Sequence, residues 1–124
     1  MENEYFNKLD KFLFKEIKDL KDLCIVEFGV REGISTKKFL ECCKKNNGKL
    51  YSVDIDDCSG VTTDKNWTFL KSRDDNFKYL DEKLPKMFDV ILIDSFHNAS
   101  HVKKILFHYY KKLKPGGLLF IDDV

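Results

Sequence analysis

Short apolar runs alternate along this chain with amphipathic helical segments, and this alternation constrains the fold more than any other feature. Strand-like runs occupy residues 23–30, 49–55, 67–72, 88–94 and 118–122. Helices are predicted over about 3–21, 35–47, 75–84 and 98–113. The run FDVILID at 88–94 is apolar on both faces, as in strands that helices cover on both sides. Such strands, joined through helices, form a parallel sheet, so the pattern predicts an α/β protein.

Local signals mark two of the element boundaries. Ser35 and Thr36 are natural N-cap residues for the second predicted helix. The segment Lys114-Pro115-Gly116-Gly117 has the composition of a turn, and we expect it to precede the last strand.

Length and charge limit the functional classes. The 124 residues fit one domain, with an N-terminal helix within 1–22 and a core over 23–124. The net charge of +1 gives no reason to expect nucleic acid or an anionic membrane as a partner. No apolar run approaches the ~18 residues of a membrane-spanning helix. The N-terminus lacks the apolar segment of a signal peptide and the four cysteines form no Cys-x-x-Cys pair, so we expect a cytoplasmic protein without a zinc site.

Two glycines follow the first strand, in the segment EFGVREGIST at 27–36. Gly29 and Gly33 let the backbone turn sharply and let a ligand come close to it. A dinucleotide-binding loop needs glycine at the place of Arg31, because a pyrophosphate must fit against the backbone there. The loop therefore favours a nucleoside ligand without phosphates over NAD; the alternative is a plain strand-to-helix turn.

Acidic residues follow the second and third strands. Asp54 lies 21 residues beyond Gly33, where a carboxylate can accept hydrogen bonds from both ribose hydroxyls. The alternative is a solvated aspartate in a turn. Ser72-Arg73-Asp74-Asp75 follows the third strand, where an adenine amino group needs an acceptor. Asp75 fits a helix N-cap equally well.

These segments together resemble the class I S-adenosylmethionine-dependent methyltransferases, and more narrowly the small-molecule O-methyltransferases with an Ile-Asp-x-x-His stretch after strand four. The likeness covers residues 23–124 and lies in EFGVREGIST, YSVDID and FDVILIDSFHNASHVKKILFHYYKKLKPGGLLFIDDV. It implies a Rossmann-like, doubly wound α/β/α sandwich of five parallel strands in the order 3-2-1-4-5. It also implies S-adenosylmethionine as cofactor and O-methylation of a small molecule or sugar. The alternative is a non-catalytic module that binds the cofactor or serves an interaction.

The resemblance also assigns site residues. The expected cofactor-binding set is Glu27, Gly29, Gly33, Ser35, Thr36, Asp54, Arg73, Asp74 and Asp94. Glu27 and Gly29 border the methionine end of the cofactor. Asp54 holds the ribose, and Arg73 with Asp74 borders the adenine.

Catalytic and metal-binding roles are expected after strands four and five. His97, three residues beyond Asp94, is the predicted general base, since an imidazole titrates in the range needed to deprotonate an acceptor hydroxyl. Some relatives bind a divalent cation at the positions of Asp94, Asp122 and Asp123, and carboxylate oxygens suit Mg²⁺. The alternative is that Asp94 orients cofactor or acceptor without a metal.

The other two histidines receive lesser roles. His101, four residues beyond His97, is expected at the surface, and a metal-binding pair of the two is the less favoured alternative. His108 is expected to pack near Tyr109.

The last predicted strand raises a question of partners. Class I methyltransferases normally add two strands after the fifth, whereas this sequence ends at Val124. The resemblance thus makes 118–122 an exposed apolar edge, which is a liability unless it is covered. We expect a fragment of a longer chain, a homodimer, or a separate polypeptide that completes this edge.

Overall fold

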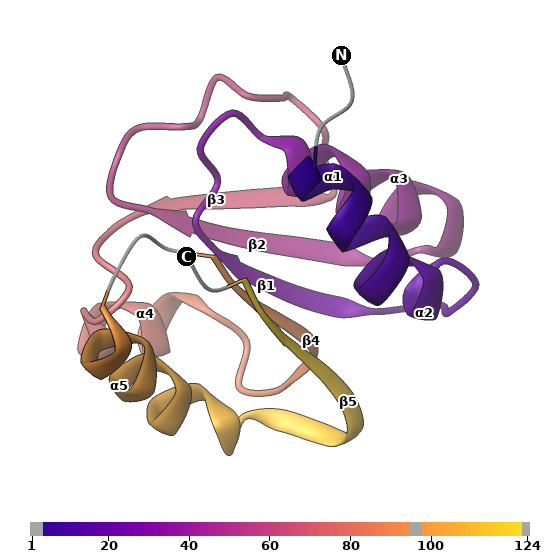
Figure 1. Cartoon of the computed structure of the whole chain (residues 1–124). Coiled ribbons are helices and arrows are strands. Elements are labelled where there is room, and N and C mark those ends of the chain that lie inside the picture. The colour runs from indigo at the N-terminus through magenta and orange to yellow at the C-terminus, as the bar shows by residue number, and fades with distance from the viewer. Residues whose placement is uncertain (1–3, 95–97, 123–124) are drawn as a thin grey trace.

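The computed structural model describes residues 4–94 and 98–122, and its centre is a five-stranded parallel sheet (Figure 1). The strands are β1 Cys24–Phe28, β2 Lys49–Asp54, β3 Trp67–Lys71, β4 Phe88–Ile93 and β5 Leu113–Ile121. They lie in the order β3-β2-β1-β4-β5, and every neighbouring pair is parallel. The predicted α/β class and strand order are confirmed, with β5 at one edge.

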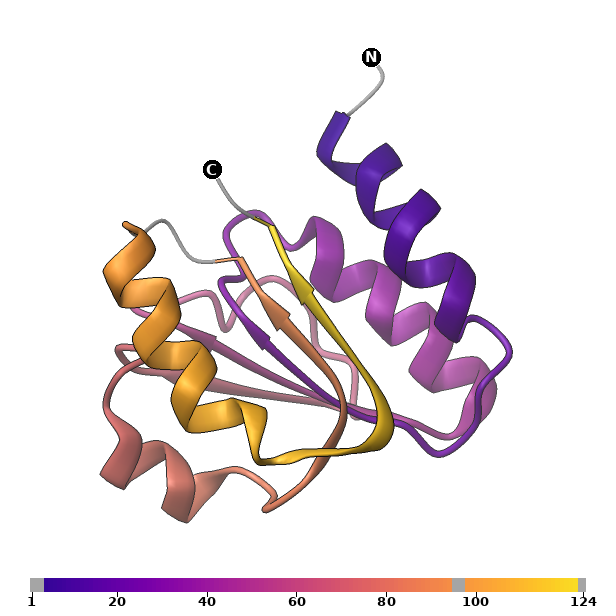
Figure 2. The same ribbon diagram turned by 60° about the horizontal axis from the view of Figure 1, so that its bottom comes forward.

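Helices cover both faces of the sheet (Figure 2). One face carries α3 Ile34–Asn46 and an N-terminal helix made of α1 Glu4–Leu9, η1 Asp10–Phe14 and α2 Lys15–Ile17. The other face carries α4 Phe77–Lys83 and α5 Ala99–Tyr110. No helix within the described ranges is both long and apolar enough to cross a membrane.

The central position of β4 explains why four successive residues of this strand, 90–93, are apolar and buried. Val90 and Leu92 pack in the cluster under α3 and the N-terminal helix, whereas Ile91 and Ile93 pack in the cluster under α4 and α5. Successive side chains of a strand point to opposite faces, so a central strand between two helical layers needs apolar residues at every position. This three-layer packing covers both faces of the sheet and leaves the carboxyl ends of its strands accessible.

The N-terminal helix differs from the expected regular helix over 3–21. Its middle turn, η1, is π-helical, and the last helical segment ends at Ile17. The wider turn inserts one residue, which keeps Leu13 and Ile17 on the buried side but turns Phe12 outward. Leu20 lies beyond the helix and is exposed.

Helix α3 begins earlier than predicted. Gly33 occupies its N-cap position with a left-handed backbone (φ 88°), which glycine adopts without steric cost. The helix starts at Ile34, so Ser35 and Thr36 lie in its first turn. Their predicted N-cap role is therefore wrong, and their hydroxyls instead donate to Glu27.

Strand β5 also begins earlier than predicted. Leu113 pairs with Phe88, and Leu118 pairs with Val90, with a shift of register between the two pairs. The segment 114–117 is therefore a bulge within the strand, and the predicted turn that ends before residue 118 is wrong. Apolar pairing on both sides of the bulge holds the whole of Leu113–Ile121 against β4.

Candidate functional site

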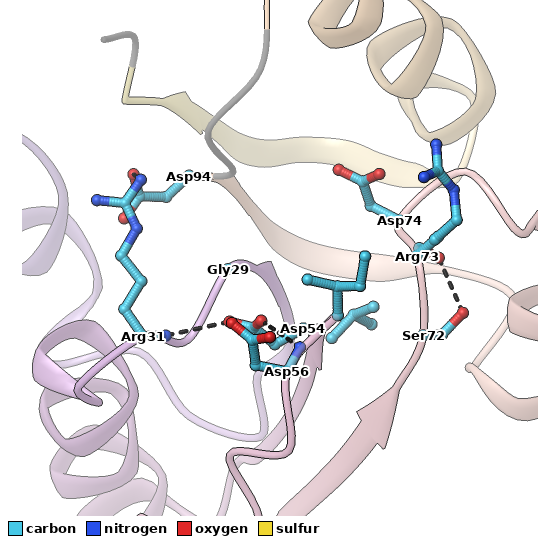
Figure 3. A pocket seen from close by; sticks show the side chains of 10 residues that line it. Gly29, Arg31, Asp54, Asp56, Ser72, Arg73, Asp74 and Asp94 are labelled. Atoms are coloured by element: carbon cyan, nitrogen blue, oxygen red, sulfur yellow. Dashed lines mark hydrogen bonds and ion pairs between the residues drawn. The ribbon is translucent and has the colours of Figure 1, made fainter.

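A pocket of about 220 Å³ lies across the carboxyl ends of β1, β2, β3 and β4 (Figure 3). Its walls are Gly29, Arg31, Val53, Asp54, Ile55, Asp56, Ser72, Arg73, Asp74 and Asp94. The walls follow the order of the sheet: 72–74 after β3, 54–56 after β2, 29–31 after β1 and then Asp94 after β4. Parallel strands bring these segments together although they are far apart in sequence. Gly29, Asp54, Arg73, Asp74 and Asp94, all predicted site residues, thus share one pocket.

Asp54 joins β2 to the loop that follows β1. Its Oδ2 accepts hydrogen bonds from the backbone N–H of Val30 (2.8 Å) and Arg31 (3.1 Å), and its Oδ1 accepts from the N–H of Asp56 (2.9 Å). Burial alone would raise the pKa of Asp54, but these N–H donors stabilise the carboxylate and lower the pKa below its usual value. The pocket therefore contains an ionised carboxylate at the end of β2.

Glu27 lies beneath the pocket and not in its wall. Its carboxylate is fully buried and accepts hydrogen bonds from Ser35 (2.7 Å), Ser52 (2.7 Å) and Thr36. Burial raises the pKa of Glu27 to about 7, against the opposite effect of the three hydroxyl donors. Glu27 thus connects β1 to α3 and, through Ser52, to β2, below the loop that carries Gly29.

The two loop glycines have different surroundings. Gly29 lines the pocket with φ 107°, and its N–H donates to the carbonyl of Val53 (2.8 Å). Gly33 does not line the pocket. A Cβ at Gly33 would lie 2.4 Å from Cγ1 of Val61, so the absence of a side chain there lets the loop between β2 and β3 approach α3. The missing side chain at Gly33 therefore makes room for another loop of the protein, and not for a ligand in the pocket.

Arg31 and Asp94 form the wall at the β1–β4 end of the pocket. Asp94 follows β4, and its N–H donates to the carbonyl of Phe28 (2.8 Å), which fixes its backbone beside β1. The guanidinium of Arg31 reaches across so that its Nη2 lies 4.0 Å from Asp94 Oδ1. The sequence analysis used Arg31 only as an argument against NAD and missed it as a wall residue. Its left-handed backbone (φ 54°), which no sequence signal indicates for arginine, directs it there.

The β3 end of the pocket is joined to α5 through Asp74 and Asp75, which contact His101 and Lys104 of that helix. Arg73 makes two hydrogen bonds to Asp75, at 2.8 and 3.0 Å, and these donors hold the pKa of Asp75 well below its usual range. Asp75 does not cap α4, which starts after Asn76. Asp74 lies in the wall, with Oδ1 2.7 Å from Nε2 of His101. His101 is thus largely buried against the site, and its expected surface position is wrong.

The remaining candidates lie away from the pocket or outside the described residues. His97 and Asp123 fall outside the described ranges, so their predicted roles stay predictions. Asp122 forms an ion pair with Lys8 of the N-terminal helix. Within residues 4–94 and 98–122, no three His, Cys, Asp or Glu side chains are grouped so as to hold a metal ion. The structure therefore gives no support to the predicted Mg²⁺ site of Asp94, Asp122 and Asp123. His108 stacks on Phe77 beside Tyr109, as expected.

Similarity to known proteins agrees with this geometry. Residues 26–124 match the family model of a methyltransferase domain. No significant match was found among curated proteins. A solved structure assigned as a ribosomal RNA methyltransferase from Plasmodium falciparum has a TM-score of 0.74 at 19% identity, covering 98% of this chain and 77% of that one.

Two further structures are described as O-methyltransferases. CalS11, a TDP-rhamnose 3′-O-methyltransferase of calicheamicin biosynthesis, has a TM-score of 0.69 at 16% identity, with 97% of this chain and 62% of that chain covered. A protein assigned as a caffeoyl-CoA O-methyltransferase from Staphylococcus aureus has a TM-score of 0.68 at 19% identity, with 98% and 58% covered. This chain thus spans less than two thirds of the length of these two. Because the family match covers most of the chain, this protein belongs to the methyltransferase-domain family, and its fold is that of the class I S-adenosylmethionine-dependent methyltransferases.

Proposed function

We propose that this chain binds S-adenosylmethionine across the pocket and transfers the methyl group to an oxygen of a small molecule or sugar. One observation carries the proposal: the ends of four neighbouring strands supply a glycine turn and several carboxylates to a single crevice. Open parallel sheets bind nucleoside ligands at this edge, where the strand order reverses. Here that reversal lies between β1 and β4, at the Gly29–Asp94 side of the pocket.

The cofactor, in this proposal, lies along the order of the strands. Asp74 faces the adenine after β3, and Asp54 accepts from the ribose hydroxyls after β2, with Asp56 as a second carboxylate nearby. Gly29 and Asp94 border the methionine end. Glu27, Gly33, Ser35 and Thr36, which do not line the pocket, support the loop that carries Gly29.

Methyl transfer requires alignment of the reacting groups more than covalent catalysis by the protein. The bound cofactor supplies an electrophilic methyl group on a sulfonium centre. An acceptor hydroxyl must be held in line with that group and must lose its proton to a base. Asp94 lies where it can orient the acceptor, and His97, three residues further along the chain, is the proposed base.

The acceptor is proposed to be small. The net charge of +1 supplies no general attraction for a polyanion. Two of the similar structures are described as O-methyltransferases of a sugar nucleotide and of a coenzyme A thioester, whereas another is assigned as a ribosomal RNA methyltransferase. A small hydroxylated acceptor is therefore the first class to test, with RNA as the comparison.

Two experiments test the proposal. Calorimetry of the purified chain with S-adenosylmethionine, S-adenosylhomocysteine and NAD should show binding of the first two and none of NAD. A labelled-methyl assay should then compare hydroxylated small molecules with RNA, in Mg²⁺ and in a chelator. Binding without transfer to any acceptor would favour the non-catalytic module, and absence of binding would overturn the proposed function.

A further inference from the structure

The N-terminal helix and α3 lie side by side on one face of the sheet (Figure 2), and a groove of about 360 Å³ lies between them. Near the start of α3, Nζ of Lys38 lies 3.7 Å from Oδ1 of Asp10. At its end, Asn46 donates to the carbonyl of Lys18 (2.8 Å). The two helices therefore run in the same direction along the groove. None of the described residues lines both this groove and the pocket at the strand ends.

Lysines dominate the lining of this groove, which we call the lysine groove. Five lysines and two acidic residues line it, together with the apolar ring of Phe14 and the thiol of Cys42. The lysines are Lys11, Lys15, Lys18, Lys38 and Lys45, and the acidic residues are Asp10 and Glu41. The whole chain has a net charge of only +1, so the positive excess in the lysine groove is a local concentration of charge.

One of the five lysines neutralises both acidic residues. Nζ of Lys38 lies 3.7 Å from Oδ1 of Asp10 and 3.7 Å from Oε2 of Glu41. Within residues 4–94 and 98–122, the other four lysines of the groove form no ion pair of 4.0 Å or less. Their charges are therefore not balanced by the described part of the protein.

Three of these four lysines are close neighbours in sequence. Lys11 and Lys15 are four residues apart, and Lys15 and Lys18 are three apart. Like charges at these spacings lie on the same side of a helix and destabilise it. Lys45 of α3 adds a further positive charge from the other side of the groove. A bound anion would remove this repulsion.

The form of the groove favours a compact ligand over a nucleic acid strand. Proteins that bind single strands combine a positive groove with exposed aromatic rings on which the bases stack. The ring that lines the lysine groove belongs to Phe14, which is only 1% exposed, so it offers no face to a base. Lys38 and Lys45 are seven residues apart on α3, so this row of charges spans about 10 Å. The groove volume lies near the lower end of the range of small-molecule pockets.

We propose that the lysine groove binds a compact polyanion that carries two or more phosphate groups, at a site separate from the cofactor pocket. Lys15, Lys18 and Lys45 donate charge-assisted hydrogen bonds to the phosphate oxygens. Lys38 neutralises the two acidic residues that would otherwise repel the ligand. Binding at this site does not require the proposed methyl transfer.

Calorimetry with tripolyphosphate tests this site. The wild-type chain should bind it in low salt, and the affinity should fall between about 50 and about 300 mM NaCl, because salt screens exposed charges. The double variant Lys18→Gln/Lys45→Gln should bind about tenfold more weakly or worse, because two charge-assisted contacts are lost. Its melting temperature should equal or exceed that of the wild type, since the repulsion between lysines is reduced.

The matched control is Lys37→Gln/Lys44→Gln, which removes two exposed lysines of α3 that do not line the groove. Its affinity for tripolyphosphate should stay within about twofold of the wild-type value, after allowing for the same change of net charge. Equal losses in the two double variants would show a general attraction between charges and would overturn the proposal. Absence of binding to the wild-type chain in low salt would also overturn it.

Three further ligands identify the source of the phosphates and the place of binding. Tighter binding of ATP than of tripolyphosphate would assign the ligand to the nucleotides, and equal or weaker binding to phosphate chains without a base. A short RNA oligomer should bind more weakly than tripolyphosphate; tighter binding of RNA would overturn the proposal in favour of a nucleic-acid surface. Saturating S-adenosylhomocysteine should leave the affinity for tripolyphosphate unchanged, and competition between the two would place the polyanion in the other pocket and overturn the proposal.

Discussion

Nε2 of His101 lies 2.7 Å from Oδ1 of Asp74, which ties the first turn of α5 to the wall of the pocket. The backbone N–H of His101 also donates to the side chain of Asn98, the N-cap of α5. One residue therefore joins the β3 end of the pocket to the helix that follows the predicted catalytic segment. Under the proposed function His101 is a positioning residue, since its contact with the pocket wall is made through Asp74.

His101→Ala should weaken S-adenosylmethionine binding several-fold, because Asp74 loses a partner that helps to orient its carboxylate. The lost hydrogen bond should also lower the free energy of unfolding by about 1 kcal/mol. Calorimetry and urea unfolding measure the two effects. His108→Ala is the matched control, because His108 makes the same kind of contact, to Asp81, at a distance from the pocket. It should cost stability and leave affinity unchanged; equal affinity losses in both variants would show that His101 acts only on the fold.

Asp54→Asn should weaken cofactor binding by about tenfold or more, because the amide presents a donor where the loop N–H groups and the ribose hydroxyls need an acceptor. The lowered pKa of Asp54 means that its ionised form stabilises the native state above the unfolded-state pKa of about 3.9. That stabilisation is lost as the pH falls through the lower folded-state pKa.

The difference in unfolding free energy between wild type and Asp54→Asn should therefore be large at pH 7 and smaller at pH 3. Urea unfolding at both pH values measures it. Asp57→Asn provides the control, because Asp57 accepts hydrogen bonds from Ser59 in its own turn and does not line the pocket. Undiminished cofactor affinity in Asp54→Asn would remove Asp54 from the site.

Sequence reasoning located the strands of the sheet because a central strand must be apolar on both faces, as in FDVILID. Ligands of parallel sheets bind at the carboxyl ends of the strands, which placed Asp54, Asp74 and Asp94 at one edge of the sheet. These three residues do line one pocket. Both inferences depend on the alternation of strands and helices along the chain, which does not depend on how individual side chains pack.

What sequence reasoning missed depends on backbone torsion and on contacts distant in sequence. Ser35 and Thr36 carry the side chains of N-caps, but the left-handed turn at Gly33 starts the helix sooner and turns them toward Glu27. His101 looked like a surface residue because its partner Asp74 is 27 residues away. The π turn of η1 was not predicted either, because the periodicity of the apolar residues indicated a regular helix.

Glu27→Gln should raise stability at alkaline pH. Burial raises the pKa of Glu27 to about 7, above its unfolded value near 4.5, so the native state prefers the protonated form. The stability contributed by that preference is full below about pH 4.5 and is lost as the pH rises through about 7. The neutral glutamine avoids the cost of a buried charge.

The variant should therefore exceed the wild type by something on the order of 1–3 kcal/mol at pH 8 and lose that advantage at pH 4.5. Denaturant unfolding at the two pH values checks the sign. Glu41→Gln, at an exposed position of α3, controls for the loss of one negative charge. A variant that is less stable than the wild type at pH 8 would show that the hydroxyl donors outweigh burial.

Gly33→Ala should destabilise the chain by about 2–4 kcal/mol, because the added Cβ both meets Val61 at 2.4 Å and occupies a left-handed conformation. Adding Val61→Ala to this variant should recover the stability lost to the steric overlap. It should not recover the stability lost to the left-handed backbone conformation. Thermal unfolding of the single and double variants separates the two. Gly60→Ala, which meets nothing within 4 Å in the same loop, should stay near the wild-type value.

Trp67 is the only tryptophan of the chain, and its indole N–H donates to Ser52 Oγ, which in turn donates to Glu27. Two successive hydrogen bonds through Ser52 therefore link the indole to the Glu27 carboxylate, which lies beneath the loop that carries Gly29. A change in the protonation of Glu27, or a movement of the loop above Glu27, should alter the polar surroundings of the indole. The fluorescence of Trp67 should then change. Intrinsic tryptophan fluorescence can therefore follow changes beneath the pocket without an added label.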